Sequence, residues 1–166
     1  MVHKLAIVAV IGLTGSAVRA VVQYQGQLST AKELGITAVT PAVFSLNGSG
    51  TGQAIAFNQD GSLTDAGHPA AAGSFVSVYA TGTGQLNPAG QAGSLALGTA
   101  STVVPVTATV GGIAAPVNYS GSAVNLLGGV SQVNVQIPPG VPAGPAQLIL
   151  RQAGSTSQAG VTIYVK

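Results

Sequence analysis

The sequence predicts an all-β fold in which two sheets pack as a sandwich. Short runs alternate apolar and polar residues with a period of two, which is the spacing of a half-buried strand. Glycine and proline punctuate these runs, with 24 Gly and 9 Pro among 166 residues. No window carries apolar residues at a convincing helical spacing. A regular succession of short strands and turns is typical of a β-sandwich.

Five runs predict the principal strands, because alternate side chains reach opposite faces of a sheet, so that one face packs while the other meets water. These runs are residues 74–79, 104–110, 132–137, 147–151 and 161–165. Three further short stretches are expected to form single helical turns at most, namely residues 31–34, 95–97 and 124–127.

The residues between these runs are of the types that favour turns. The pair Asp60-Gly61 separates two short apolar runs and suits a type I′ hairpin. The pair Gly111-Gly112 is expected to join the strand that ends at Val110 to the next strand. The Pro-Pro-Gly stretch at 138–140 should end a strand, because proline has no N–H to donate to the ladder.

Charge is scarce in this chain. It has five Lys or Arg and three Asp or Glu residues, whereas ordinary soluble domains carry roughly 25% charged residues. Repulsion between copies is therefore weak, which favours a protein that ends up packed against another domain, another copy or an extracellular layer.

Composition also excludes several functional classes. The five cations are scattered, so nucleic-acid binding lacks its electrostatic basis. With no Trp, four Tyr and three Phe, the chain has no aromatic platform on which bases or sugars could stack. The absence of Cys excludes disulfides, thiolate catalysis and Cys-ligated metals.

The N-terminal region has two competing interpretations. One is a signal peptide within residues 1–20, with a short basic start, an apolar run at 5–13 and small or apolar residues at Val18 and Ala20. That apolar run is too short to span a bilayer, so no transmembrane segment is predicted.

The other interpretation is a partial repeat. When the chain is shifted by 128 residues, Val21 and Val22 fall on Ile149 and Leu150, while apolar and glycine positions elsewhere agree: Leu5 with Val133, Ile7 with Val135, Gly26 with Gly154 and Ser29 with Ser157. After a short insertion, residues 35–39 overlay 160–164. Residues 1–39 would then be the last three strands of a sandwich whose first strands are missing, followed by a complete sandwich at 40–166.

Three stretches resemble a known family. They contain TPAVFSLNGSGTGQ at 40–53, GSFVSVYATGTGQ at 73–85, and QVNVQIP with SQAGV at 132–138 and 157–161. The chain resembles the Solibacter-type C-terminal domain of large exported acidobacterial proteins, and its last part is similar to immunoglobulin-like modules of the IPT/TIG kind. The partial three-stranded unit at 1–39 is predicted from the repeat. The resemblance implies an extracellular, immunoglobulin-like β-sandwich at 40–166. It implies no enzymatic activity.

No stretch of the sequence has a strong pattern for catalysis or for binding phosphate or a metal. The Gly82-Thr83-Gly84 stretch lacks the helix and Lys of a phosphate loop, so a glycine-rich crossover loop is expected. Four oxygen-bearing residues could suggest calcium, but their spacing misses the EF-hand loop: Asn58, Asp60, Ser62 and Asp65. His68 lacks the surroundings of a hydrolase triad, and the two aspartates are a poor glycosidase pair. We therefore predict no catalytic residue, metal or cofactor.

The partial N-terminal unit carries the functional prediction, because three strands with one apolar face are not stable alone. We expect a non-catalytic extracellular structural or adhesive module that pairs strands with copies of itself or with neighbouring immunoglobulin-like domains, with a fibre as one form. The predicted interface residues are Leu5, Ile7, Val21, Val22 and Ile36. The alternative is a module that binds polysaccharide or protein through the loop at residues 82–93.

Overall fold

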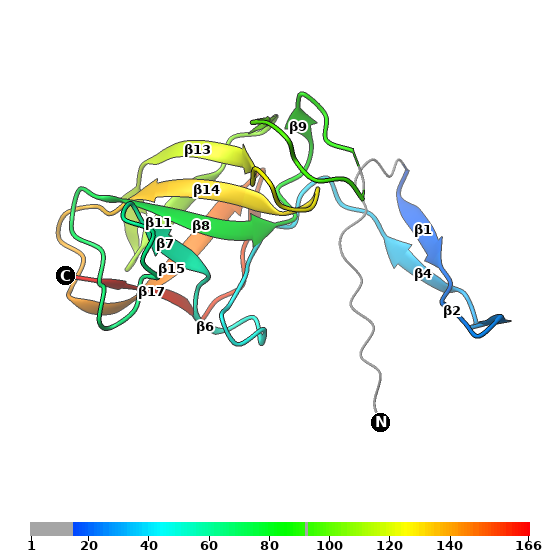
Figure 1. Cartoon of the computed structure of the whole chain (residues 1–166), viewed down its shortest axis with the longest axis horizontal. Helices are drawn as coiled ribbons and strands as arrows, with labels where there is room; N and C mark the ends of the chain where they lie inside the picture. Colours follow the sequence, from blue (N-terminus) through cyan, green and yellow to red (C-terminus); the bar gives the residue numbers. More distant parts are fainter. Residues whose placement is uncertain (1–14, 92) are drawn as a thin grey trace.

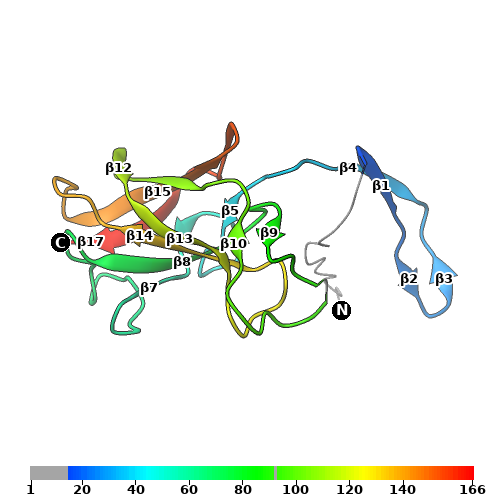
Figure 2. The ribbon, with the colours of Figure 1, turned by 90° about the horizontal axis from the view of Figure 1, so that it is seen from above.

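The computed structural model describes residues 15–91 and 93–166, which form a β-sandwich with a hairpin arm at one end (Figure 1). The C-terminus lies at the end opposite the arm in both views (Figures 1 and 2). The described residues contain no helix, and so none that is long and apolar enough to cross a membrane. The all-β prediction is confirmed for this part of the chain. The strand expected near Leu5 and Ile7 lies outside the described residues.

The first sheet has the order β5-β8-β14-β13-β10-β9, with β7 also paired to β8. Every pairing in it is antiparallel. Its strands are β5 (Ala42–Val43), β7 (Ala56–Asn58), β8 (Phe75–Thr81), β9 (Leu86–Asn87), β10 (Ser101–Thr102), β13 (Val117–Ser122) and β14 (Ser131–Gln136).

The second sheet has the order β12-β11-β15-β17-β6, with β16 also paired to β15. Only β6 runs parallel to its neighbour, β17. Its strands are β6 (Gly52–Gln53), β11 (Thr107–Val110), β12 (Ile113–Ala115), β15 (Gly144–Gln152), β16 (Ser155–Thr156) and β17 (Val161–Val165).

The core consists of the inward-facing positions of both sheets. Burial alternates along β8, β14, β15 and β17, as the period-two pattern predicts. Burying these aliphatic side chains supplies most of the stabilisation, at roughly 25 cal/mol per Å² of apolar area. The fully buried members include Val76, Val78, Val133 and Val135 of the first sheet and Leu148, Leu150, Val161 and Ile163 of the second.

The predicted runs correspond to β8, β11, β14, β15 and β17, and Gly111-Gly112 forms the two-residue turn between β11 and β12, with both φ angles positive. The hairpin expected at Asp60-Gly61 is present, with Phe57 paired antiparallel to Leu63, but the predicted turn type I′ is wrong. Gly61 N donates to Asn58 O, and only Gly61 has a positive φ, whereas type I′ requires two such residues. The helical turn expected at 31–34 is also wrong, because this stretch pairs as a strand.

The arm joins the sandwich at the crossover after β8. Thr40 N donates to Gly82 O at 2.8 Å, and Val39 is buried against this loop. Gly82 has φ +71°, and a Cβ there would lie 2.0 Å from Thr40 O. The expected glycine-rich crossover loop is therefore confirmed, and its glycines let two backbones approach closely.

Replacing Gly82 with alanine should destabilise the sandwich by about 3 kcal/mol or more, because backbone strain and a steric clash with Thr40 add together. The matched control is Gly73→Ala, which has a similar φ of +82° but open space around the new Cβ. The control should cost only about 1 kcal/mol. Chemical denaturation of both variants measures the difference, and equal losses would contradict the role given to the close approach.

Candidate assembly interface

The arm is a single long hairpin. Strand β1 (Ala17–Ala20) pairs with β4 (Lys32–Gly35), and β2 (Gln23–Tyr24) pairs with β3 (Gln27–Leu28). The two residues at its tip, Gln25 and Gly26, both have positive φ, as a two-residue hairpin turn requires. The register sets Arg19 opposite Glu33, so residues of opposite charge occupy facing positions on the two strands.

The tip of the arm repeats the β15–β16 hairpin of the sandwich. That hairpin also turns through two residues of positive φ, Ala153 and Gly154. Its strand register is the same when counted from the turn: Gln23 faces Leu28 and Tyr24 faces Gln27 in the arm, as Arg151 faces Thr156 and Gln152 faces Ser155 in the sandwich.

One serine bonds in the same way in both hairpins. In the arm, Ser29 Oγ accepts a hydrogen bond from Val22 N at 3.0 Å, and Ser29 N donates to Val22 O at 2.9 Å. In the sandwich, Ser157 Oγ accepts from Leu150 N at 3.0 Å, and Ser157 N donates to Leu150 O at 2.8 Å. These are the pairs that the shift of 128 residues aligns, so sequence and geometry agree at this point.

The base of the arm also matches, with one correction to the overlay. Val18 faces Leu34 in the arm as Ala146 faces Ile163 in the sandwich. The arm is one residue shorter between its serine and its last strand, so Gly35 takes the place of Tyr164. The overlay of 35–39 on 160–164 is therefore wrong, because register is fixed by backbone pairing and not by the few shared residues.

The two hairpins differ in what covers them. Leu150 and Ile163 are 0% exposed in the core, whereas their counterparts Val22 and Leu34 are 41% and 40% exposed. Among the predicted interface residues, Val22 and Ile36 occupy positions on the face that is buried in the sandwich hairpin, and Val21 lies on the other face. Leu5 and Ile7 fall outside the described residues. The sequence prediction missed the exposed Tyr24, Leu28 and Leu34 of the arm.

The arm also lacks the neighbouring strands that the sandwich hairpin has. Strand β15 pairs along its outer edge with β11, and β17 pairs with β6. Among the described strands, β1 pairs only with β4 and β2 only with β3. An exposed strand edge is a template for pairing with another chain.

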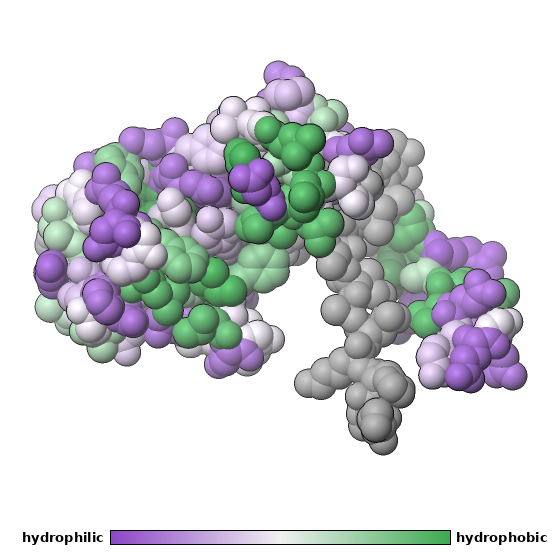
Figure 3. Space-filling view, viewed as in Figure 1, coloured by the Kyte–Doolittle hydropathy of each residue, from purple (hydrophilic) through white to green (hydrophobic). Residues whose placement is uncertain are grey.

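A second apolar surface, here called the leucine loops, is formed by residues 94–98 and 123–130. The two segments bond to each other, with Ala96 N donating to Leu126 O at 2.8 Å and Asn125 N to Ala96 O at 2.7 Å. Leu97 is 85% exposed. Figure 3 shows apolar atoms gathered on this part of the sandwich. The exposed apolar members are Leu95, Leu97, Val124, Leu126 and Leu127.

The leucine loops lie at the end of the sandwich from which the arm leaves. Thr81 Oγ1 donates to Gly129 O at 2.9 Å, just before the crossover that receives Thr40. Sequence reasoning expected isolated helical turns here and did not identify a surface, because the pairing of the two loops joins segments about thirty residues apart. The gathering of exposed apolar side chains makes the leucine loops a candidate interaction surface.

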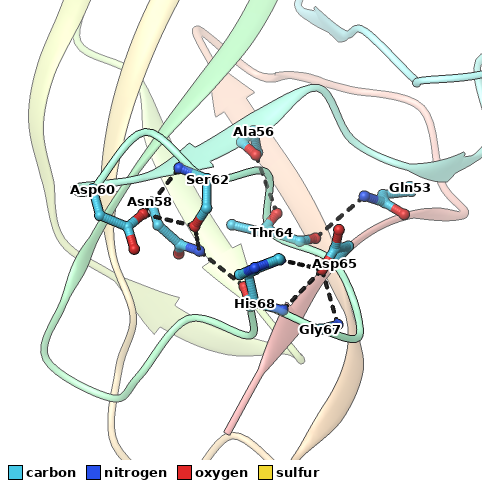
Figure 4. Close-up of polar contacts among 9 residues, drawn as sticks. All are labelled: Gln53, Ala56, Asn58, Asp60, Ser62, Thr64, Asp65, Gly67 and His68. Carbon is cyan, nitrogen blue, oxygen red and sulfur yellow. Dashed lines mark hydrogen bonds and ion pairs between the residues drawn. The ribbon is translucent and has the colours of Figure 1, made fainter.

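The aspartate-rich loop at 58–68 has a structural role (Figure 4). Asp60 Oδ1 accepts from Ser62 N and Ser62 Oγ at 2.9 and 2.6 Å. Asp65 Oδ1 accepts from Gly67 N and His68 N, both at 2.8 Å, and lies 3.0 Å from His68 Nδ1. The carboxylates thus hold tight turns, and residues 15–91 and 93–166 contain no group of three His, Cys, Asp or Glu that could bind a metal.

Comparisons with known proteins give no identification: no family model matches the chain, and no curated protein or solved structure is significantly similar to it.

Acid should weaken the 58–68 loop. Hydrogen bonds from Ser62 lower the pKa of Asp60 below its ordinary 3.8, and the contact with His68 lowers that of Asp65. A carboxyl whose folded pKa is lowered contributes its full stability above its unfolded pKa, and this is lost as the pH falls through the folded value.

Carbon-detected NMR of the carboxyl groups should therefore give both midpoints below 3.8. The free energy of unfolding should fall less between pH 5 and pH 2 in Asp65→Asn than in the unmodified chain. A variant that loses as much stability as the parent would show that Asp65 makes no contribution.

Proposed function

We propose that this protein is a non-catalytic structural module, exported from a bacterial cell, that joins like immunoglobulin-like modules end to end through its arm. The observation that carries the proposal is the repeated hairpin: the same register, turn and serine bonds occur once in the sandwich, where the inward face is buried, and once in the arm, where that face is exposed. A hairpin of this kind needs a partner, since two strands are only marginally stable in water.

The mechanism is strand pairing along the exposed edge together with burial of the apolar face. The partner is a copy of this protein or a neighbouring immunoglobulin-like domain. Scarce charge favours this, because few ions have to lose their hydration when two such surfaces meet. The leucine loops lie at the same end and extend the apolar surface that a joined module would cover.

The family resemblance supports the same proposal. The Solibacter-type C-terminal domain belongs to exported proteins, and an immunoglobulin-like topology suits modules that follow one another along a chain or fibre. The sheet orders of this chain provide the two packed layers that such a module needs.

A second candidate function is ligand binding beside the leucine loops. A shallow cavity of about 220 Å³ is lined there by residues that include Leu86, Pro88, Leu95 and Thr99. Ligand pockets usually measure about 300–1,000 Å³, so this cavity is small. Binding on a glycan array that is lost in Leu95→Asp would favour this alternative, and an array without signals would count against it.

The proposal predicts concentration-dependent association in sedimentation experiments and regular filaments or oligomers in negative-stain micrographs. Val22→Asp should weaken association more than about tenfold, because it places a charge on the face to be buried. Gln23→Asp is the matched control, since its counterpart Arg151 is exposed in the sandwich. A protein that stays monomeric with an ordered, buried N-terminal segment, or equal effects of the two variants, would refute the proposal.

A further inference from the structure

We propose that the cognate partner of the arm is an incomplete β-sandwich built like residues 39–143 of this chain, for which the arm acts as the missing last hairpin. This inference rests on the proposed joining role of the arm and names its partner. The argument is that the protein already contains this hairpin a second time and shows what covers it there.

The edge to be paired is defined by the register. In the sandwich, β11 pairs with β15 over Thr107–Val110, setting Thr109 opposite Ile149 and Val110 opposite Leu148. The counterparts of these β15 residues in the arm are Val21 and Ala20. The partner should therefore lay a strand of the β11 kind along residues 20–23.

The face to be covered has the right chemistry. Leu148, Leu150 and Ile163 pack in the core against residues of β8 and β14. The arm places Ala20, Val22 and Leu34 at the same positions. The smaller Ala20 is offset by larger residues at the ends of the hairpin, where Val18 replaces Ala146 and Ile36 replaces Val165. The volume of the face is thus nearly conserved, which is the condition for a packed core to accept a replacement.

Two positions differ in kind. Tyr24 takes the place of Gln152, which is buried and donates to Thr83 O and Val104 O. Lys32 takes the place of Val161, which is fully buried and pairs with Gly52 of β6. This position begins the last strand, so the lysine stem can lie along the apolar face while its ammonium reaches water. We therefore expect the natural partner to leave the position of Lys32 accessible to water. A partner copied from this chain should bind an arm that carries Lys32→Val better than the unmodified arm.

The test is a fusion in which residues 39–143 precede the complete chain, so that the N-terminal segment before β1 connects the added strands to the arm. Tethering raises the effective concentration of the added strands to the millimolar range. Hydrogen exchange of the arm amides is compared with that of the unfused chain, at a concentration at which the unfused chain is monomeric.

Arm amides in the fusion should exchange about 100-fold or more slowly, because they become part of a folded core. Val22→Asp should remove this protection and unfold the added segment, while Gln23→Asp should leave both unchanged. Lys32→Val should increase the protection.

Two results would overturn the inference. One is equal exchange of the arm with and without the added segment, in the native fusion and in Lys32→Val alike. The other is an arm protected only by pairing with a second arm, seen as a dimer in which the added segment stays unfolded.

The same experiment separates this inference from the proposed function. If the unfused chain associates through its arm but the fusion leaves the arm unprotected, the incomplete sandwich is not the partner, while the joining role of the arm is supported. If the fusion folds while the unfused chain stays monomeric at every concentration, self-association is refuted, while the incomplete sandwich is supported as the partner.

Discussion

A β-hairpin with one apolar face has to be covered, and this requirement connects the parts of this protein. The sandwich meets it internally, since β15 and β17 lie against the first sheet and their inward side chains are fully buried. The arm presents the same hairpin without that cover. Backbone pairing and turn geometry are local, so they persist in both settings, whereas burial depends on what lies opposite.

The junction between arm and sandwich adds a second constraint. Val39 and Thr40 hold the chain against the Gly82–Gly84 crossover, where two backbones lie too close for any side chain on Gly82. The buried Gln152 donates from Nε2 to Thr83 O and Val104 O, tying the same crossover to a neighbouring loop. The arm therefore leaves from a well-bonded end of the sandwich, beside the leucine loops.

The few charged residues of this chain lie mainly in the arm and in tight turns. Three of the charged residues, Arg19, Lys32 and Glu33, lie in the arm, and Arg19 and Glu33 face each other across it. Asp60 and Asp65 are engaged in turns. Little charge is left to repel a second module, and the exposed apolar residues gather at one end of the sandwich and on the arm.

The sequence by itself located five of the longer strands, β8, β11, β14, β15 and β17, and part of the arm, whereas β13 was not predicted. Period-two alternation located β8, β14 and β17, because the pleat forces alternate side chains to opposite faces. The shift of 128 residues aligned Ser29 with Ser157, whose hydrogen bonds proved equivalent, because a serine bond to a nearby strand is a local interaction.

Only the tertiary structure decided the register of β4 and the existence of the leucine loops. Both depend on pairing between segments that are separated in the sequence: Leu95 lies beside Leu127, and Val18 lies opposite Leu34. The tertiary structure also decided which apolar residues become core and which become surface, since Val22 and Leu150 both follow an aliphatic residue, precede a polar one and occupy equivalent places in their hairpins. Whether a residue is buried depends on the surface that packs against it, and the local sequence of a strand does not reveal that opposing surface.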